Sequence, residues 1–395
     1  MMSLDLFQQQ ISQLIHAALA AVEPAQAVRQ HVHREGNLLS LDKTIIDLDT
    51  IQEVRLVAVG KAAAPMALAS QSLINEKLRA GVVVTKYGHL GPLAQWDDPR
   101  LQLIEAGHPI PDENSLRAGQ SVANLVSSCT EQTLVLACIS GGASALMVLP
   151  QPGIRLSTMQ AINDALLRSG AGIEEMNSVR SRLDQLKGGG LVRCTAPGRV
   201  VALILSDVVG DPIDVIASGL TYDPRATNIL VANNTQGCQA VASAARDLGY
   251  NASIVTTQLG GEARDQGQLM AQAICDAAAG TCLIYGGETT VTLQDSGKGG
   301  RNQELALAAA IELNRHPACN ACVAAFGTDG TDGPTDAAGA LATPDTLQRA
   351  ASRGLNATDS LTRHDSYHFF DALGDLLRTG PTGTNVADIV ITLRM

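Results

Sequence analysis

The chain has 395 residues, more than the ~250–300 residues that a single hydrophobic core usually serves, so two domains are expected. Hydrophobic residues make up 45% and aromatic residues only 3%, which means that the cores must be packed with aliphatic side chains. The net charge of −11, without a block of lysines and arginines, excludes nucleic acid as a general partner, and no apolar run reaches the ~20 residues of a membrane span.

The first predicted element is an amphipathic helix within residues 4–33, and its start lacks the basic segment of a signal peptide. Strands and helices then alternate. The expected strands are RLVAVG, AGVVVTKYG, LQLIEA, TLVLACI and RVVALILS, and the expected helices are APMALASQSL, LRAGQSVANLVSS, STMQAINDALLRSG and IEEMNSVRSRLDQLK. This alternation is typical of βαβ units and predicts a mostly parallel, Rossmann-like sheet in a first domain, residues 1–232.

The alternation starts again near residue 233. The strands NASIVTT, TCLIYGG, ACVAAFG and ADIVITLR are expected, with the helices TQGCQAVASAARDLGY, ARDQGQLMAQAICDAAAG and NQELALAAAIELNR. We therefore predict a second, smaller α/β domain over residues 233–395. Because ligands of open α/β sheets bind beyond the carboxyl ends of the strands, the loops after the strands are where a site is expected.

Two helix starts carry cations that their own helices disfavour. Lys61 follows the strand RLVAVG, and Lys298 and Arg301 precede the helix ELALAAAIEL. A helix N-terminus carries about half a positive charge, so a cation there is unfavourable by ~0.3–1 kcal/mol. A bound polyphosphate would supply the missing negative charge, whereas the alternative is a solvated basic loop.

A glycine-rich loop, residues 140–144, follows the strand TLVLACI. Its glycines would let backbone amides approach an anion, although a tight turn that needs positive φ would use the same residues. Lys187 stands directly before three glycines. Two explanations are open for Lys187: it could cap a helix C-terminus, or it could bind a ligand.

Carboxylates follow several of the expected strands, next to glycines. In such places they are candidate Mg²⁺ ligands or a catalytic base, but Asp-Gly pairs are also ordinary turn chemistry. A single carboxylate of this kind is therefore weak evidence for a site, and the prediction depends on six of them following expected strands. The residues are Asp207, Asp211, Glu288, Asp329, Asp332 and Asp336.

Cysteines and histidines give weaker signals. The eight cysteines are scattered, which predicts reduced thiols in a cytoplasm, and the lone pair Cys319 and Cys322 does not predict zinc. His89 and His108 lie at strand ends, where a structural hydrogen bond and a contact with an anionic ligand are both open. The residues together predict a cytoplasmic α/β enzyme, or a binding protein, for a phosphorylated ligand, with phosphoryl transfer as the expected chemistry.

Nine segments of the chain, in order, resemble the class II glycerate kinases, which are glycerate 2-kinases that carry a MOFRL domain. The segments are VGKAAAPMA, KYGH, GHPIPDENS, ISGGASALM, NSVRSRLDQLKGGGL, LSDVVGDPIDVIASG, GGETTVTL, GKGGRNQELALA and GTDGTDGPTDAAG. The tail TGPTGTNVADIVITL also resembles the end of that family. The resemblance covers nearly the whole chain.

The resemblance implies a Rossmann-like N-terminal domain, a smaller mixed α/β C-terminal domain of the MOFRL type, and an active site between them. It implies a phosphotransferase with an alcohol acceptor, which transfers the γ-phosphoryl group of ATP to the 2-hydroxyl of D-glycerate with Mg²⁺ and gives 2-phosphoglycerate. The expected partners are therefore D-glycerate and ATP, without nucleic acid or membrane, and a homodimer is the candidate assembly.

The resemblance also implies roles for single residues. Lys61 and Arg301 are expected to neutralise the transferring group, with Asp207 as the third catalytic residue. Glu288, Asp329 and Asp332 are the expected metal ligands. Substrate or phosphate binding is expected of Ser140, Gly141, Gly142, Ser144, Lys187, Asn302 and His108.

Two other functions compete with this one. Some relatives are named hydroxypyruvate reductase, but an NAD(P)H-dependent enzyme of that kind would want G-x-G-x-x-G after a strand, and the loop after the first strand reads G-K-A-A-A-P. A non-catalytic sugar-acid-binding protein is the second rival. As a sensor it would need a partner domain such as a DNA-binding one, and this acidic chain has no basic recognition helix.

Overall fold

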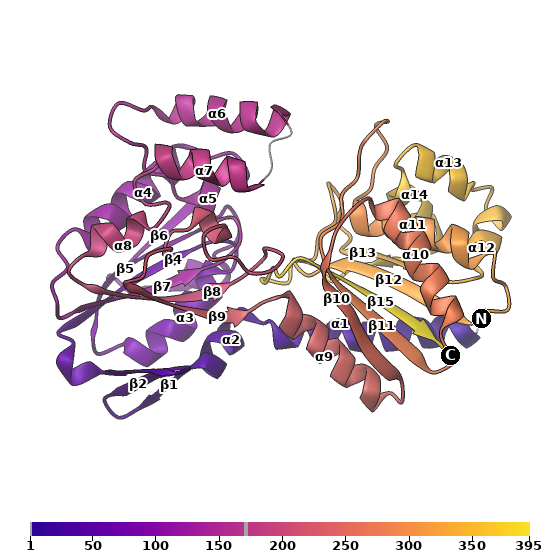
Figure 1. Cartoon of the computed structure of the whole chain (residues 1–395), viewed down its shortest axis with the longest axis horizontal. Helices are drawn as coiled ribbons and strands as arrows, with labels where there is room; N and C mark the ends of the chain where they lie inside the picture. Colours follow the sequence, from indigo (N-terminus) through magenta and orange to yellow (C-terminus); the bar gives the residue numbers. More distant parts are fainter. Residues whose placement is uncertain (1, 170–172) are drawn as a thin grey trace. The chain divides into compact units, whose positions relative to one another are not determined.

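The computed structural model of the chain describes residues 2–169 and 173–395 and divides into two compact units (Figure 1). We call residues 23–233 the N-terminal unit, and residues 1–22 with 234–395 the C-terminal unit. The later boundary lies one residue from the expected one. The first 22 residues, however, were expected in the N-terminal domain, and they belong to the C-terminal unit instead.

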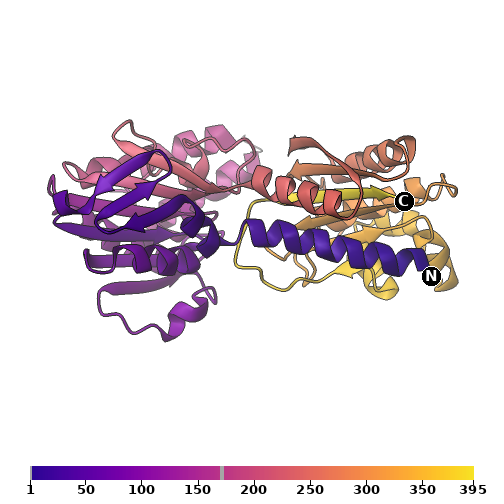
Figure 2. The same ribbon diagram turned by 90° about the horizontal axis from the view of Figure 1, so that it is seen from below.

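The helix α1 (Met2–Ala21) explains this correction. It lies along the C-terminal unit (Figure 2), where Phe7, Ile11 and Leu14 are buried in one cluster with Val241 of α9 (Asn234–Asp247). The helical spacing of these apolar residues was visible in the sequence. The spacing shows that a helix has a face to bury, but it does not tell which sheet will cover that face.

The N-terminal unit is built on six parallel strands in the order β6-β5-β4-β7-β8-β9. The Val, Leu and Ile runs of the four inner strands are buried on both faces, as is typical of parallel sheets. A separate antiparallel sheet, β1-β2-β3, was not anticipated. The strands are β1 (Val32–Glu35), β2 (Leu38–Leu41), β3 (Thr44–Asp47), β4 (Glu53–Val59), β5 (Leu78–Lys86), β6 (Leu101–Ala106), β7 (Thr133–Ile139), β8 (Arg199–Leu205) and β9 (Ala226–Ala232).

Helices connect these strands. Among them, α4 starts at a capping box, in which Asp112 accepts a hydrogen bond from the amide of Ser115. The helices are α2 (Pro24–His31), α3 (Ala63–Ile74), α4 (Glu113–Val126), α5 (Ala143–Leu146), α6 (Leu156–Ser169), α7 (Ile173–Leu183) and α8 (Gly190–Thr195), with the 3₁₀ turns η1 (Leu48–Thr50), η2 (Gly91–Gln95) and η3 (Ile216–Ser218). Because α7 ends at Leu183, Lys187 does not lie at a helix C-terminus as expected.

The C-terminal unit contains a mixed sheet in the order β10-β11-β15-β12-β13-β14. The last strand of the chain, β15, runs antiparallel between β11 and β12. Its first residue, Asp388, therefore pairs with the last residues of both neighbours, Gly287 and Gly327. The strands are β10 (Asn251–Leu259), β11 (Thr281–Gly287), β12 (Ala321–Gly327), β13 (Gly339–Ala342), β14 (Leu376–Leu377) and β15 (Asp388–Arg394).

Helices cover both faces of this mixed sheet (Figure 1). One core cluster lies between the sheet and α10 and α11, and another lies between the sheet and α1 and α9. No helix in the described part of the chain is long and apolar enough to cross a membrane. Besides α1 and α9, the helices of the unit are α10 (Ala263–Asp276), α11 (Arg301–Leu313), α12 (Thr346–Ser352), α13 (Ala357–Thr362) and α14 (Ser366–Leu373).

One cysteine pair departs from the expectation of reduced thiols. Cys275, at the end of α10, and Cys319, just before β12, form a disulfide that closes a loop with a sequence separation of 44. The described free cysteines include Cys322, which is buried. Packing of α10 beside β12 brings Cys275 to Cys319, and the spacing of cysteines along the chain gave no reason to select this pair.

Candidate functional site

The glycine-rich loop of the N-terminal unit brings five predicted site residues together. A Cβ atom on Gly141 would lie 1.9 Å from Oδ2 of Asp207, and one on Gly142 would lie 3.2 Å from Nε2 of His108 and 3.5 Å from Cγ of Lys61. Gly142 also has a φ of +87°, which disfavours other residues. Glycine is therefore required at both positions, because the loop is packed between these side chains.

Lys61 is fixed to this loop through its backbone. Its amide donates to the carbonyl oxygen of Gly141 (2.9 Å), and the hydroxyl of Ser140 accepts from the amide of Ala62 (3.0 Å). Ser140 is 1% exposed, so its side chain supports the start of α3 and lies under the loop. Lys61, in contrast, is partly exposed, and it stands just before the N-cap of α3.

The charge of Lys61 contributes to a lowered pKa of the neighbouring His108. Burial, and then the positive charges of Lys61 and Lys86 together with His89, lower the pKa of His108 to about 4. His108 is therefore a neutral imidazole at pH 7. The part of the shift that comes from Lys61 and Lys86 reflects a positive potential, which favours an anion, whereas burial disfavours charge of either sign.

Lys187 and Ser144 take part in hydrogen bonds that support this loop. Lys187 is 2% exposed, and its Nζ atom donates to the carbonyl oxygen of Ser144 (2.8 Å) and lies 3.5 Å from Oδ2 of Asp184. The hydroxyl of Ser144 is 2.9 Å from that of Ser218, which donates to Asn177 (3.0 Å). These contacts connect Lys187 and Ser218 to α5, so the buried Lys187 has a supporting position, while Ser144 remains partly exposed.

In the C-terminal unit, Arg301 is the first residue of α11 and is held by two carboxylates. Its Nε and Nη2 atoms donate to the two carboxylate oxygens of Asp388, and its Nη1 atom donates to Glu288. Although burial favours the neutral form, the hydrogen bond and charge of Asp388 and the charge of Glu288 raise the pKa of Arg301. Asp388 was not among the predicted residues.

Asp388 could not be selected from the sequence pattern alone. It begins a strand, whereas the search for site residues followed the ends of strands. Because β15 is antiparallel, its beginning lies where β11 and β12 end. The signal that was available is a carboxylate directly before the buried run IVITL, which is an unusual place for a charge.

Asp332 and Asn302 form the start of α11. The two oxygens of the Asp332 carboxylate accept hydrogen bonds from the amides of Asn302 (3.1 Å) and Gln303 (2.8 Å), and burial raises the pKa of Asp332 to about 7. Asp332 thus caps α11 from the loop that follows β12, instead of standing open as a metal ligand. Asp329, on the same loop, accepts from the amide and hydroxyl of Thr331 (both 3.0 Å).

The expected magnesium ligands do not form a cage. Within residues 2–169 and 173–395, no group of three or more His, Cys, Asp or Glu side chains is arranged to hold a metal ion. Glu288 is paired with Arg301, and Asp332 is engaged by α11. Mg²⁺ in kinases usually keeps waters and takes one or two carboxylates together with the substrate phosphates. The residues fit an ion of that kind, and they do not fit a resident ion.

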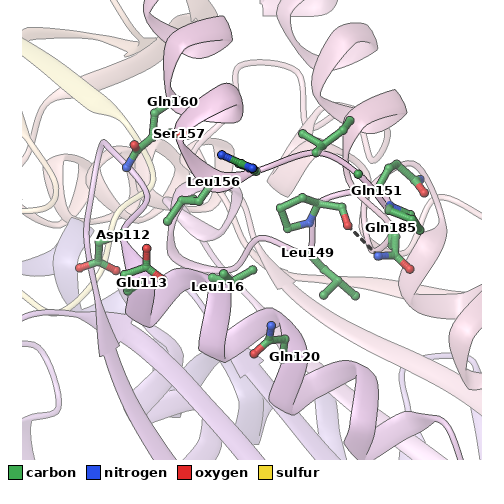
Figure 3. A pocket seen from close by; sticks show the side chains of 15 residues that line it. Asp112, Glu113, Leu116, Gln120, Leu149, Gln151, Leu156, Ser157, Gln160 and Gln185 are labelled. Carbon is green, nitrogen blue, oxygen red and sulfur yellow. Dashed lines mark hydrogen bonds between the residues drawn. The ribbon is translucent and has the colours of Figure 1, made fainter.

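A pocket of about 770 Å³ lies beside the His108 loop, between α4 and the segment 149–160 (Figure 3). Leu116 and Gln120 line it from α4, and Gln160 lines it from α6. Gln160 also donates to the carbonyl oxygen of Pro111 (2.7 Å), which ties α6 to the loop that carries His108. None of the predicted site residues lines this pocket, so we assign it no ligand.

Comparison with known proteins places both units in families. A model described as "Domain of unknown function (DUF4147)" matches residues 10–245, and the model of the MOFRL family matches residues 281–388. A D-glycerate 2-kinase of Thermotoga maritima is 40% identical, with 96% of this chain and 97% of that protein aligned. A protein of Agrobacterium vitis named putative hydroxypyruvate reductase is 39% identical over 85% of each chain.

A solved structure shares the fold. The crystal structure of glycerate kinase from Thermotoga maritima superimposes with a TM-score of 0.87 at 37% identity and covers 99% of this chain and 100% of its own. This match confirms the expected fold class, a mostly parallel α/β domain with a second, mixed one. The matches at the level of sequence confirm the resemblance that the nine segments indicated.

Proposed function

This chain belongs to the family of glycerate 2-kinases that carry a MOFRL domain, and from that premise we propose how its residues transfer the γ-phosphoryl group of ATP to the 2-hydroxyl of D-glycerate. The observation that carries the function is the alignment of almost the whole chain with a D-glycerate 2-kinase at 40% identity. The aligned region spans both units and so includes the loops at the strand ends, where function usually resides.

The N-terminal unit supplies the positive field for an anionic substrate. Lys61 stands beside the loop of Gly141 and Gly142, and His108 next to it stays neutral. A neutral imidazole can donate one hydrogen bond and accept another, so it can orient a hydroxyl or an oxyanion without adding charge. Asp207, on the other side of Gly141, is the carboxylate nearest to the loop glycines and is our candidate for orienting the acceptor hydroxyl.

The C-terminal unit supplies a second cation, whose direction is fixed. Phosphoryl transfer needs little covalent help from the protein, because catalysis comes mainly from positioning and from neutralising charge on the phosphoryl oxygens. Arg301, oriented by Asp388 at the N-terminus of α11, suits this task. We therefore assign Lys61 and Arg301 to the transferring group, and Asn302 and Asp332 to the support of α11.

ATP is the substrate that kinase activity implies, and we propose that Mg²⁺ arrives bound to its phosphates. The ion would neutralise phosphate charge and act as a Lewis acid. Asp329, which is partly exposed near Asp388, could complete the coordination of the ion, whereas Glu288, the other expected ligand, is paired with Arg301. We also propose a cytoplasmic location, a homodimer as the assembly, and the two units as the two functional domains.

Two alternative functions remain to be separated by experiment. The Agrobacterium vitis relative carries a reductase name, but the turn after β4 reads Gly-Lys-Ala-Ala-Ala-Pro and offers no dinucleotide fingerprint. A sugar-acid-binding protein would bind D-glycerate and leave ATP unchanged.

The deciding assay mixes the protein with ATP, Mg²⁺ and D-glycerate and identifies the product by phosphorus NMR. We expect 2-phosphoglycerate and ADP. Oxidation of NADH or NADPH by hydroxypyruvate, with no turnover of ATP, would replace the kinase with the reductase. Binding of D-glycerate without any turnover would support the binding protein.

A further inference from the structure

The two carboxylates that hold Arg301 differ in how firmly they are fixed. Asp388 has 3% of its side chain exposed and uses both oxygens, one on Nε and one on Nη2. Its backbone is fixed as well, since it is paired on both sides within the sheet and its carbonyl oxygen accepts from the side chain of Asn234 (2.9 Å). Asp388 has neither room nor solvent into which it could move.

Glu288 is held by much less. Its side chain is 45% exposed and contacts Arg301 through Nη1 alone. Its backbone amide donates to the carbonyl oxygen of Leu259 (2.9 Å), so the main chain is fixed and only the side chain can turn. A carboxylate that is half in solvent gives up an exposed ion pair at little cost.

The guanidinium therefore has one permanent and one exchangeable edge. Asp388 occupies the edge of Nε and Nη2 and faces into the protein. Nη1 donates to Glu288, and the Arg301 side chain remains 33% exposed. A phosphate oxygen has the charge and acceptor geometry of the Glu288 oxygen that it would replace.

We propose that Asp388 is a positioning residue that keeps the fork of Arg301 aimed, and that Glu288 is a counter-ion which a phosphate oxygen of the nucleotide displaces. This inference rests on the proposed kinase function. The exchange keeps the charge around Arg301 balanced, because Glu288 turns to solvent as the phosphate arrives. One hydrogen bond to Nη1 replaces another, and no covalent bond is made or broken. Glu288 then competes with ATP, whereas Asp388 serves the transfer step.

The start of α11 supports the same division of roles. Asp332 fixes the amides of Asn302 and Gln303, so the backbone that carries Arg301 is already set. Only the side chain needs to be aimed, and Asp388 does so through two parallel hydrogen bonds. Substitution of Asp388 therefore loosens the Arg301 side chain and removes a contact with the side chain of Asn302, while Asp332 still caps the helix.

The test compares Asp388→Asn with a matched control, Asp375→Asn. Asp375 has 1% of its side chain exposed and accepts two hydrogen bonds from Arg349 (3.0 and 2.6 Å) in the same unit. It is thus an equally buried Asp–Arg pair that the mechanism does not use. We expect similar losses of thermal stability, a fall of at least 100-fold in kcat with no rise in KM for ATP in Asp388→Asn, and kcat within twofold of the wild type in Asp375→Asn.

The proposed displacement of Glu288 by a phosphate oxygen is tested by a binding measurement, so this test does not depend on turnover. The β,γ-imido analogue of ATP, with Mg²⁺, and D-glycerate are titrated separately into the wild type and Glu288→Gln by calorimetry. We expect at least threefold tighter binding of the nucleotide to the variant and no change for D-glycerate. Asp371→Asn is the control, because Asp371 is similarly exposed (49%) and also accepts from one arginine, Arg378.

Several outcomes would overturn the inference. If Asp388→Asn lost no more kcat than Asp375→Asn, the carboxylate would have a structural role only. Weaker nucleotide binding by Glu288→Gln, with a higher Mg²⁺ requirement, would make Glu288 a metal ligand, and an effect confined to D-glycerate would remove the assignment to phosphate. Should the wild type show no turnover of ATP and D-glycerate, the proposed function itself would fail.

Discussion

The cations of the two units stand in opposite electrostatic surroundings. Around Lys61, burial and neighbouring positive charges lower the pKa of His108 to about 4. Around Arg301, two carboxylates raise the pKa of the arginine although burial opposes its charge. The lysines near His108 therefore add positive potential, which favours an anion, whereas the charge of Arg301 is bound by two carboxylates.

This difference suggests a division of work between attraction and orientation. Lys61 lies on a partly exposed loop and contributes positive potential, whereas Arg301, clamped by a buried carboxylate, contributes direction. Preorganised groups of both kinds lower the barrier of a reaction that spreads charge over phosphoryl oxygens. The comparison can be tested on each side by removing one charge at a time.

The largest effect is expected for Lys61→Ala. We expect kcat/KM to fall about 10³-fold, or ~4 kcal/mol of transition-state stabilisation, because the field at the loop would lose its nearest cation. The measurement is steady-state kinetics with ATP and D-glycerate, and Lys43→Ala on the exposed β2–β3 turn is the control. Turnover within threefold of the wild type would remove Lys61 from the mechanism.

Arg301→Ala should differ from Lys61→Ala in stability. It leaves Asp388 buried without its partner, and loss of one member of a buried pair costs about 3–5 kcal/mol. Lys61 is partly exposed, so its removal should stay within about 0.5 kcal/mol. Urea unfolding of both variants measures this contrast. The addition of Asp388→Ala to Arg301→Ala should recover part of the loss, and equal stabilities of the two single variants would contradict the comparison.

The disulfide allows the C-terminal unit to be weakened separately. Replacement of Cys275 and Cys319 by serine should lower the free energy of unfolding of that unit by about 2–4 kcal/mol, because the bond closes a long loop. The N-terminal unit holds neither cysteine, so its unfolding should not change. Thermal unfolding with and without dithiothreitol, followed by calorimetry, tests this, and a shift in both transitions would count against it.

The smallest effect concerns His108 and pH. Its folded-state pKa, about 4, lies below the usual 6.5, so its contribution to stability is present above pH 6.5 and is lost as the pH falls towards 4. Relative to His108→Gln, the wild type should lose stability over that window. Proton NMR should show a neutral His108 ring at pH 6 and a higher pKa of His108 in Lys61→Ala. A measured pKa of His108 near 6.5 would show that the loop has no positive field.

Part of this architecture could be predicted from local pattern. The strand TLVLACI is β7 with the same bounds, and the loop after it carries Gly141 and Gly142 beside Lys61 and His108. Parallel strands explain this success, because every βαβ unit delivers its loop to the same edge of the sheet. Knowledge of which residues follow strands was then enough to predict which residues of the N-terminal half of the candidate site lie together.

The other half depended on pairings that local pattern does not encode. The edge strand β9 (Ala226–Ala232) and the sheet β1-β2-β3 lacked a clear signal, and the apolar face of α1 could have been covered by either unit. Asp332 looked like a ligand because it follows a strand, but its carboxylate caps a helix thirty positions earlier in the chain. Hydrogen bonds between distant segments are decided by where those segments pack.

By itself the sequence determined the alternation of strands and helices, the aliphatic cores, the glycines that the first loop needs, and the presence of two cations at helix starts. These features follow from side-chain periodicity and from backbone preference, which act over a few residues. Only the tertiary structure decided that β15 runs antiparallel between β11 and β12, and hence that Asp388 meets Arg301. Strand direction is set by the burial of whole faces, and no short stretch of the chain contains that information.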